Sequence, residues 1–126
     1  MARQWDLERL ERDLKRERSR VLRRSREAVA ETATEVRDTW RSRMRARSHH
    51  GHIPYLPNAI TSTVSAGDHG PEAEVGPDKS RRQGPLGNLL EFGSRNNKPH
   101  RDGYTALRER EEAFVERIDQ IARGAL

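Results

Sequence analysis

The sequence contains no cysteine, and no run of apolar residues is long enough to cross a bilayer. The first absence excludes disulfides, thiolate metal sites and a cysteine nucleophile. The N-terminus is charged rather than signal-like, so we expect synthesis in the cytoplasm and no membrane partner.

Core-forming residues are also scarce. The sequence is 32% hydrophobic and 36% charged, and its mean hydropathy is -1.09. Such a composition is close to that of chains that cannot fold alone. The apolar residues are nevertheless periodic, so the 126 residues predict one domain with a small core, completed by oligomerisation.

A single long helix is predicted for residues 2–47, which contain no glycine or proline and are dense in helix formers. Apolar or small residues recur there at steps of three, four and seven, at Leu7, Leu10, Leu14, Val21, Ala28 or Val29, Ala33, Val36, Trp40 and Met44. A helix of this length would reach roughly 65–70 Å. We therefore expect its first half to project beyond the globular part.

The apolar stripe of this helix changes character along its length. Up to Val21 it is a narrow leucine seam between opposite charges, as in a coiled coil or a partner-facing edge. From Ala28 to Met44 it carries residues suited to packing on a sheet. The predicted organisation is a basic helix over residues 1–48 and a small α+β portion over 49–126 that packs with residues 28–48.

The positive charge of the chain belongs to its N-terminal third. Residues 1–48 hold 15 Lys and Arg against 9 Asp and Glu, whereas residues 49–126 hold 10 against 11. A solvated helical face is one interpretation of the arginines. Contact with nucleic acid or with an acidic neighbour is the other.

The sequence His49-His50-Gly51-His52 is predicted to end the helix, with Gly51 as the breaker. Three histidines in four residues can bind a metal, but no carboxylate or further ligand lies at a useful local spacing. We therefore predict no metal site. Residues 53–58, with Pro54 and Pro57, predict an extended, turn-rich linker.

A β-hairpin is predicted next. Residues 59–65 are rich in Thr, Ile and Val, residues 67–70 (Gly-Asp-His-Gly) form a turn, and residues 72–75 alternate polar and apolar. A basic, exposed loop then covers residues 78–83.

Glycine-proline pairs flank that loop, at Gly76-Pro77 and Gly84-Pro85. The spacing of the following leucines predicts a short helix that begins at Pro85 and ends just before Gly93, with a strand over residues 88–92 as the alternative. The side chains expected to pack this helix against the domain are Leu86, Leu89, Leu90 and Phe92.

A loop over residues 94–103 leads to a last helix over residues 104–123, with Asp102 as its N-cap and Gly124 as its stop. Its apolar positions are Tyr104, Leu107, Phe114, Ile118 and Ile121, and its acidic positions, expected in solvent, are Glu109, Glu111, Glu112 and Glu116. The predicted fold class is α+β, with helices over one face of a small antiparallel sheet.

No catalytic pattern is present. The glycines between residues 76 and 87 lack the strand, turn and Lys-Ser/Thr ending of a phosphate loop, and no serine lies in a nucleophile-elbow context. Glu91 beside Phe92 is a carboxylate in an apolar setting. We expect a structural role for it, capping a loop or pairing with Arg81, Arg82 or Arg95. We predict no enzyme and no cofactor.

A family resemblance rests on Val75-Gly76-Pro77, on Leu89 to Ser94 (Leu-Leu-Glu-Phe-Gly-Ser) and on Pro99-His100. The order of these segments resembles the small neck and tail-component family of long-tailed double-stranded DNA bacteriophages, also described as head–tail connector or tail-completion proteins. The resemblance covers residues 28–121. The residues that carry its motifs are Gly76, Pro77, Leu89, Leu90, Glu91, Phe92, Gly93 and Pro99.

The resemblance implies a structural virion protein that assembles as a homo-oligomeric ring, a hexamer or a dodecamer, between the capsid portal complex and the tail. Its expected partners are neighbouring adaptor or stopper proteins, the tail terminator or tail tube, and DNA in the lumen. A closed ring needs complementary surfaces on opposite sides of a subunit. We therefore expect the basic N-terminal helix to meet the acidic C-terminal helix of a neighbour. The predicted interface residues are Leu7, Leu10, Leu14, Val21, Arg81, Arg82, Glu109, Glu111 and Glu112.

Two other functions fit parts of the sequence. A small nucleic-acid-binding protein would use the arginine-rich helix on phosphates, although acids are mixed with the bases and no DNA-reading motif is present. A coiled-coil scaffold would use residues 7–21 and is compatible with either function.

Overall fold

The computed structural model describes residues 4–47, 54–95 and 98–125. α1 (Gln4–Arg47) is one continuous helix of 44 residues, about 66 Å long at about 1.5 Å per residue. The remaining elements are α2 (Leu56–Ala59), β1 (Ile60–Gly67), β2 (Gly70–Pro77), the 3-10 helix η2 (Gly84–Leu86), α3 (Gly87–Phe92) and α4 (Asp102–Ala125). This order confirms the α+β class.

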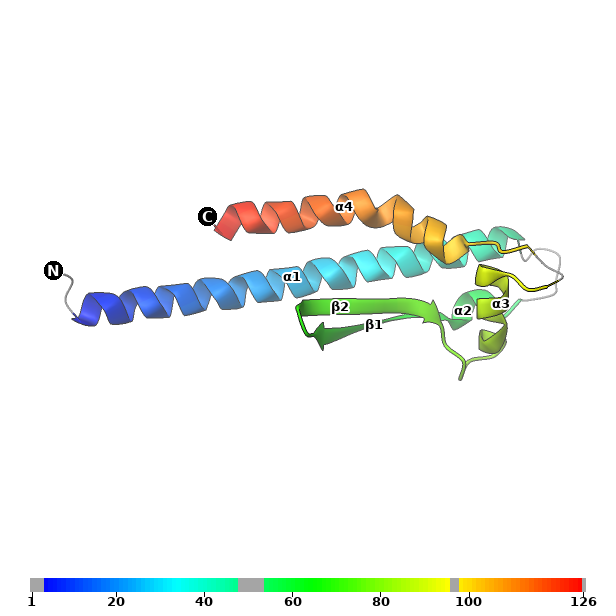
Figure 1. Cartoon of the computed structure of the whole chain (residues 1–126), viewed down its shortest axis with the longest axis horizontal. Helices are drawn as coiled ribbons and strands as arrows, with labels where there is room; N and C mark the ends of the chain where they lie inside the picture. The colour runs from blue at the N-terminus through cyan, green and yellow to red at the C-terminus, as the bar shows by residue number, and fades with distance from the viewer. Residues whose placement is uncertain (1–3, 48–53, 96–97, 126) are drawn as a thin grey trace.

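α1 runs through the whole molecule, with the β-hairpin on one side of it and α4 on another (Figure 1). Its buried side chains begin at Ala28 and end at Met44. Between Asp6 and Glu27 no side chain is buried, and this part of the helix extends past the end of α4 and the tip of the hairpin. The prediction that the first half of the helix projects is confirmed.

The core lies where α1 meets the hairpin and the beginning of α4. Its buried members are Val36, Trp40, Met44, Leu56, Ala59, Ile60 and Ala106, and Val75 and Leu90 pack against it partly buried. The α1 stripe from Ala28 to Met44 therefore does pack against the sheet, as its composition predicts.

The segment predicted as an extended linker contributes to this core, so that prediction is wrong for its second part. Leu56 begins the short helix α2 and is fully buried, as is Ile60 just after the helix. Pro57 is compatible with a helix here because the first-turn N–H groups have no intrahelical partner. Burial of Leu56 then fixes the turn against the rest of the domain.

The hairpin has the predicted turn, and its strands are longer than predicted. β1 and β2 pair antiparallel from Ile60 opposite Pro77 to Gly67 opposite Gly70, so Asp68 and His69 form a two-residue connection. The guanidinium of Arg41 on α1 donates two hydrogen bonds of 2.9 and 2.7 Å to the carbonyl oxygen of Ile60. The start of the sheet is thereby held on the long helix.

The stretch from Gly84 to Phe92 is helical, and the alternative of a strand is wrong. Gly93 follows it with φ of 79°, a left-handed backbone that favours glycine and ends the helix. The predicted packing is wrong, because Leu86, Leu89 and Phe92 are 41%, 53% and 76% exposed and only Leu90 reaches the core. α3 instead faces the domain with Gly87, which lies against Pro77, and with Glu91, which is buried.

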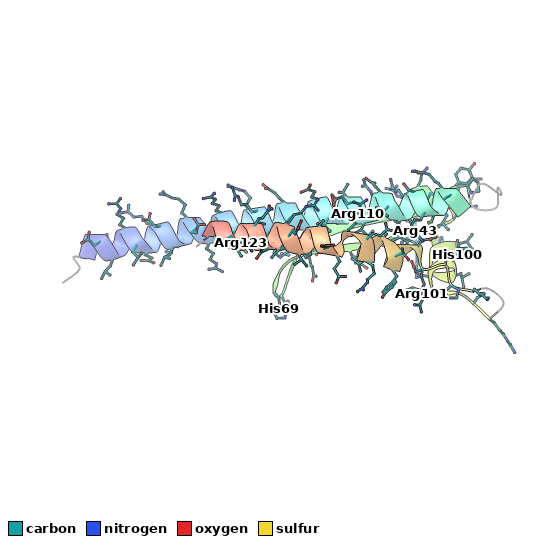
Figure 2. All side chains as sticks on the ribbon, turned by 90° about the horizontal axis from the view of Figure 1, so that it is seen from above. Arg43, His69, His100, Arg101, Arg110 and Arg123 are labelled. Atoms are coloured by element: carbon teal, nitrogen blue, oxygen red, sulfur yellow. The ribbon has the colours of Figure 1, made fainter. Side chains whose placement is uncertain are left out.

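α4 begins and ends within two residues of the prediction, and it lies antiparallel to α1 (Figures 1 and 2). Asp102 and Gly124, predicted as its N-cap and its stop, both lie inside the helix, so these two predictions are wrong. Its apolar positions do not all pack. Tyr104 and Leu107 are 56% and 54% exposed, whereas Ala106 is fully buried. Phe114, Ile118 and Ile121 are half-buried. The two exposed residues face the groove described below rather than the core.

Candidate assembly surfaces

Glu91 caps the first turn of α4. Its side chain is 6% exposed and accepts hydrogen bonds from the backbone N–H of Gly103 at 2.8 and 3.2 Å and, more weakly, from that of Tyr104 at 3.4 Å. These N–H groups are unpaired donors in the first turn of α4, where the helix dipole favours a negative charge. The structural role predicted for Glu91 is confirmed in the capping form.

The same turn explains a glycine that the sequence pattern leaves unaccounted for. A Cβ at Gly103 would lie 2.5 Å from a ring carbon of Trp40 and 2.6 Å from a carboxylate oxygen of Glu91. Only glycine lets the first turn of α4 approach both side chains. The backbone N–H groups of His100 and Arg101 also donate to the carbonyl oxygens of Leu90 and Glu91, at 2.8 and 3.3 Å, so α3 and the start of α4 form one unit.

Charged groups hold α4 on α1 inside the chain. Arg117 donates to both carboxylate oxygens of Glu35 at 2.8 and 2.6 Å and to the hydroxyl of Thr32 at 2.9 Å, and it lies 3.3 Å from Glu31. The hydrogen bonds from Arg117 hold the pKa of the Glu35 carboxyl below its usual value, against a partial loss of solvent that raises it. In this group the base is on α4 and the acids are on α1, which is the reverse of the pairing expected between a basic α1 and an acidic α4.

A second group lies at the other end of the helix pair. Arg43 of α1 donates to Asp102 at 3.2 Å and lies 3.6 Å from Glu109, and Arg110 of α4 donates to the hydroxyl of Thr39 (Figure 2). Of the three acids of α4 that the sequence assigns to an interface, Glu109 is thus engaged within the chain. Glu111 pairs with Arg108 on the same helix at 3.3 Å, and Glu112 is exposed.

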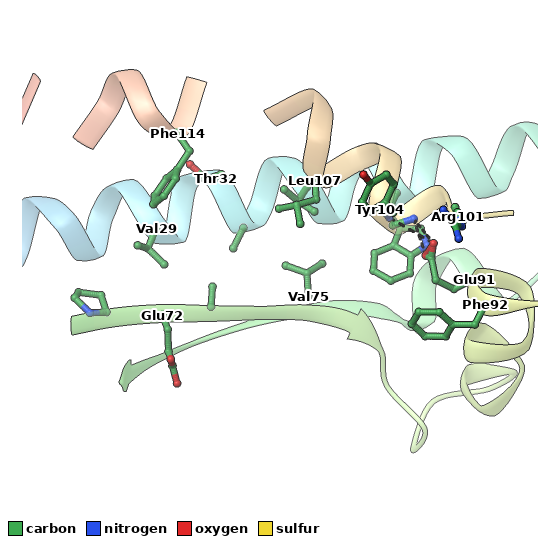
Figure 3. A pocket seen from close by; sticks show the side chains of 16 residues that line it. Val29, Thr32, Glu72, Val75, Glu91, Phe92, Arg101, Tyr104, Leu107 and Phe114 are labelled. Atoms are coloured by element: carbon green, nitrogen blue, oxygen red, sulfur yellow. Dashed lines mark hydrogen bonds between the residues drawn. The ribbon is translucent and has the colours of Figure 1, made fainter. Parts of the chain in front are cut away.

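An open apolar groove separates α4 from the hairpin, and we name it the central groove. Its volume is about 710 Å³, α1 forms its floor, and β2 and the first half of α4 form its sides. Among its lining residues are Val36, Trp40, Ala73, Val75, Tyr104 and Leu107. Figure 3 shows Leu107 and Phe114 directed from α4 into this space, with Val75 on the opposite side. Apolar side chains therefore face solvent where a closed domain would have a filled core.

A second apolar surface lies on the projecting half of α1, and we name it the leucine stripe. Leu7, Leu10 and Leu14 are 57%, 55% and 63% exposed on one helix face. Val21, further along the same face, is half-buried. The leucine stripe lies far from the other predicted interface residues, because the loop with Arg81 and Arg82 is near the opposite end of α1 (Figure 1).

The helix between residues 15 and 26 is strongly basic. It holds seven Lys and Arg against one Glu, and all seven bases are exposed. Lys15 pairs with Glu11 at 3.0 Å. The side chains of the other six bases, all arginines, make no ion pair or hydrogen bond with the described residues, and their positions are 16, 18, 20, 23, 24 and 26.

The loop arginines have structural contacts. Arg81 donates to the carbonyl oxygen of Asn58 at 3.0 Å, and the Arg82 guanidinium lies 3.6 Å from the centre of the Tyr55 ring. Both arginines fasten the loop to the segment before β1. Of the remaining motif residues, Gly76 and Pro77 end β2, Gly93 ends α3, and Pro99 is exposed in the loop before α4.

In the described ranges no three His, Asp or Glu side chains are grouped as a metal site, and no helix there combines the length and apolar content needed to span a membrane. The histidines at positions 49, 50 and 52 lie outside these ranges. No protein-family model, no curated protein and no solved structure matches the chain.

The sequence pattern misses the central groove and the Arg117–Glu35 pair. The sequence gives only a partial signal for the groove: Tyr104, Leu107 and Phe114 mark an apolar face of the last helix, but their spacing does not show that this face borders open space. The pair between Arg117 and Glu35 has no such signal, because both helices carry charges of both signs at nearly every turn.

Proposed function

We propose that this protein is a structural subunit of the neck of a long-tailed double-stranded DNA bacteriophage, a head-to-tail connector or tail-completion protein. In this role copies of the chain form a closed ring between the capsid portal complex and the tail, and the DNA passes through its lumen. The ring has neighbouring neck proteins and the tail terminator or tail tube as partners. The order of the hairpin, the Glu-Phe-Gly turn and the last helix supports the resemblance from which this proposal starts.

One observation carries the self-association. The protein exposes two apolar surfaces, the central groove and the leucine stripe, and these are different surfaces on different parts of the molecule. Exposed apolar patches of this kind mark sites of protein contact. Two distinct surfaces favour a heterologous, head-to-tail contact, which generates a ring when its rotation closes.

The test is the assembly state of the full-length protein. Light scattering after size exclusion, together with negative-stain micrographs, is expected to show rings of one size at micromolar concentration. A chain that stays monomeric at 100 µM in low salt would overturn the proposal. A second measurement concerns the neck itself: deleting the gene from the phage that carries it should give DNA-filled heads and finished tails that do not join.

A second function is favoured by the six exposed arginines between residues 16 and 26, which lack a partner among the described residues. Such a surface binds phosphates, and the affinity falls steeply with salt. In a ring, contact with the DNA in the lumen would use the same arginines. Tight, salt-dependent binding of a mixed-sequence duplex by the monomer, with no ring at any concentration, would favour the nucleic-acid-binding function instead.

A further inference from the structure

The projecting half of α1 carries five arginines in a row on one side of the helix. At about 100° per residue they fall within a sector of about 80°, and the row is about 21 Å long. From residue 6 to residue 26, all within the described helix, no acid lies in this sector, and Glu27 is the first acid to enter it. The five side chains are exposed and make no ion pair or hydrogen bond with the described residues. We name the row the arginine stripe, and its members are Arg9, Arg12, Arg16, Arg20 and Arg23.

The arginine stripe and the leucine stripe lie on nearly opposite sides of α1, about 150° apart. Thr32, which accepts a hydrogen bond from Arg117 of α4, comes 18 residues after Leu14, which is five helical turns. The leucines therefore continue the side of α1 on which α4 packs. By the same spacing Arg16 lies five turns before Thr34, which is exposed. The arginine stripe thus continues the outer side of α1, and the rest of the domain leaves it open.

Between residues 6 and 17, acids separate the two stripes along both borders. Asp6, Asp13 and Glu17 lie between them on one side, and Glu8 and Glu11 on the other. A membrane that took up the leucines would bring these acids to its surface, where anionic headgroups repel them. Insertion of the helix into the major groove of DNA would press the same acids toward the phosphates on both sides. The arginine stripe can therefore meet a polyanion only along one line.

We infer that the arginine stripe binds the phosphate backbone of duplex DNA along its length, without reading the base sequence. The inference deepens the proposed function and rests on it for the identity of the polyanion, because DNA is the polymer that passes through a neck. Of the six unpaired arginines between residues 16 and 26, only Arg16, Arg20 and Arg23 belong to this site, and Arg9 and Arg12 extend it toward the N-terminus.

The spacing and the type of the bases fit this ligand. The arginines follow one another at steps of about 4.5 and 6 Å along a straight helix. One strand of B-DNA carries a charge every 3.4 Å of its axis, so about six phosphates lie along the 21 Å of the stripe. A guanidinium binds a phosphate through two parallel hydrogen bonds, which an ammonium cannot do. The leucine stripe stays free for a protein contact while the arginines hold DNA.

Two variants of the full-length protein remove equal charge from different sides of the helix. Arg9→Gln/Arg16→Gln/Arg23→Gln removes three members of the stripe. The matched control, Arg18→Gln/Arg24→Gln/Arg26→Gln, removes three exposed arginines outside it. Glutamine has nearly the helix propensity of arginine, so both variants should keep α1, which far-UV circular dichroism checks. The probe is a fluorescein-labelled mixed-sequence duplex of roughly 30 base pairs, whose anisotropy is titrated with protein from about 50 to about 200 mM NaCl.

The salt dependence of the affinity is the readout. Each engaged stripe of the wild type should give a slope of log affinity against log salt of about −4.5, from five phosphate contacts at about 0.9 each. The stripe variant should lose about three fifths of the wild-type slope, and the control variant less than about one fifth. Duplexes of unrelated sequence should bind within about twofold of one another, because phosphate contacts carry no sequence information.

Four results would overturn the inference. Equal losses in the two variants would mean that the positive charge acts diffusely rather than through the stripe. Tighter binding to phosphatidylserine-containing vesicles than to the duplex would make the partner a membrane. Equal binding to polyglutamate would show that the row does not select phosphates. A wild-type protein that does not bind the duplex at about 50 mM NaCl would have no such site.

Light scattering of the same samples separates this inference from the proposed ring. Rings that do not bind the duplex would overturn the inference and leave the ring standing. Binding through the stripe by a protein that stays monomeric would overturn the ring and leave the inference standing. A monomer that does not bind the duplex would overturn both.

Discussion

Replacing Glu91 by glutamine tests the cap at the start of α4 with the least change of shape. Glutamine keeps one acceptor oxygen and nearly the same volume, and it removes the negative charge from the first turn of the helix. The two strong contacts of the carboxylate are the hydrogen bonds of 2.8 and 3.2 Å from the N–H of Gly103. The contact of 3.4 Å to the N–H of Tyr104 is too long to contribute much.

The expected loss follows from these contacts. A hydrogen bond to a charged group contributes about 1.5–3 kcal/mol, roughly twice the value for a neutral one. The glutamine variant should therefore lose about 1–1.5 kcal/mol of the free energy of unfolding. Glu91→Ala, which leaves the N–H of Gly103 unpaired beside a small cavity, should lose about 2–4 kcal/mol.

The assay is urea denaturation followed by far-UV circular dichroism at a fixed protomer concentration, because self-association adds to the apparent stability. The control is Glu112→Gln, an exposed acid of the same helix, for which we expect a change within about 0.5 kcal/mol. If Glu91→Gln and Glu112→Gln unfold with equal free energies, the cap does not stabilise the fold and the reasoning is refuted.

Three further substitutions have defined outcomes in the same denaturation assay. Leu56→Ala empties a fully buried site and should lose about 2–5 kcal/mol; a loss below 1 kcal/mol would contradict the position of α2 in the core. Gly103→Ala should lose about 1–3 kcal/mol, because its methyl group overlaps Trp40, and wild-type stability would show that the helix can shift. Glu35→Gln should lose about 1 kcal/mol at pH 7, because Arg117 loses its charged partner. The pKa of Glu35 is lowered in the folded state, so its contribution is present above the unfolded pKa of about 4.3 and disappears as the pH falls through the folded pKa. The difference between wild type and Glu35→Gln should therefore narrow below about pH 4, and a constant difference would contradict the pairing.

Patterns that depend on local geometry were predictable from the sequence. A helix period sustained for 44 residues without glycine or proline specifies α1, and Gly67 to Gly70 between two alternating segments specifies the hairpin. The helix end at Gly93 follows from the left-handed backbone that this position needs. Each of these features is determined by residues near one another in the sequence.

Features that depend on contacts between distant segments were not predictable. The leucines of α3 have helical spacing, but two contacts with distant segments determine which side of this helix packs. Gly87 lies close against Pro77, and Glu91 accepts hydrogen bonds from the first turn of α4. The spacing of the apolar residues in α4 likewise identifies the apolar face of the helix, but it does not identify the element that packs on that face. Leu107 has the same spacing as a core residue and is exposed.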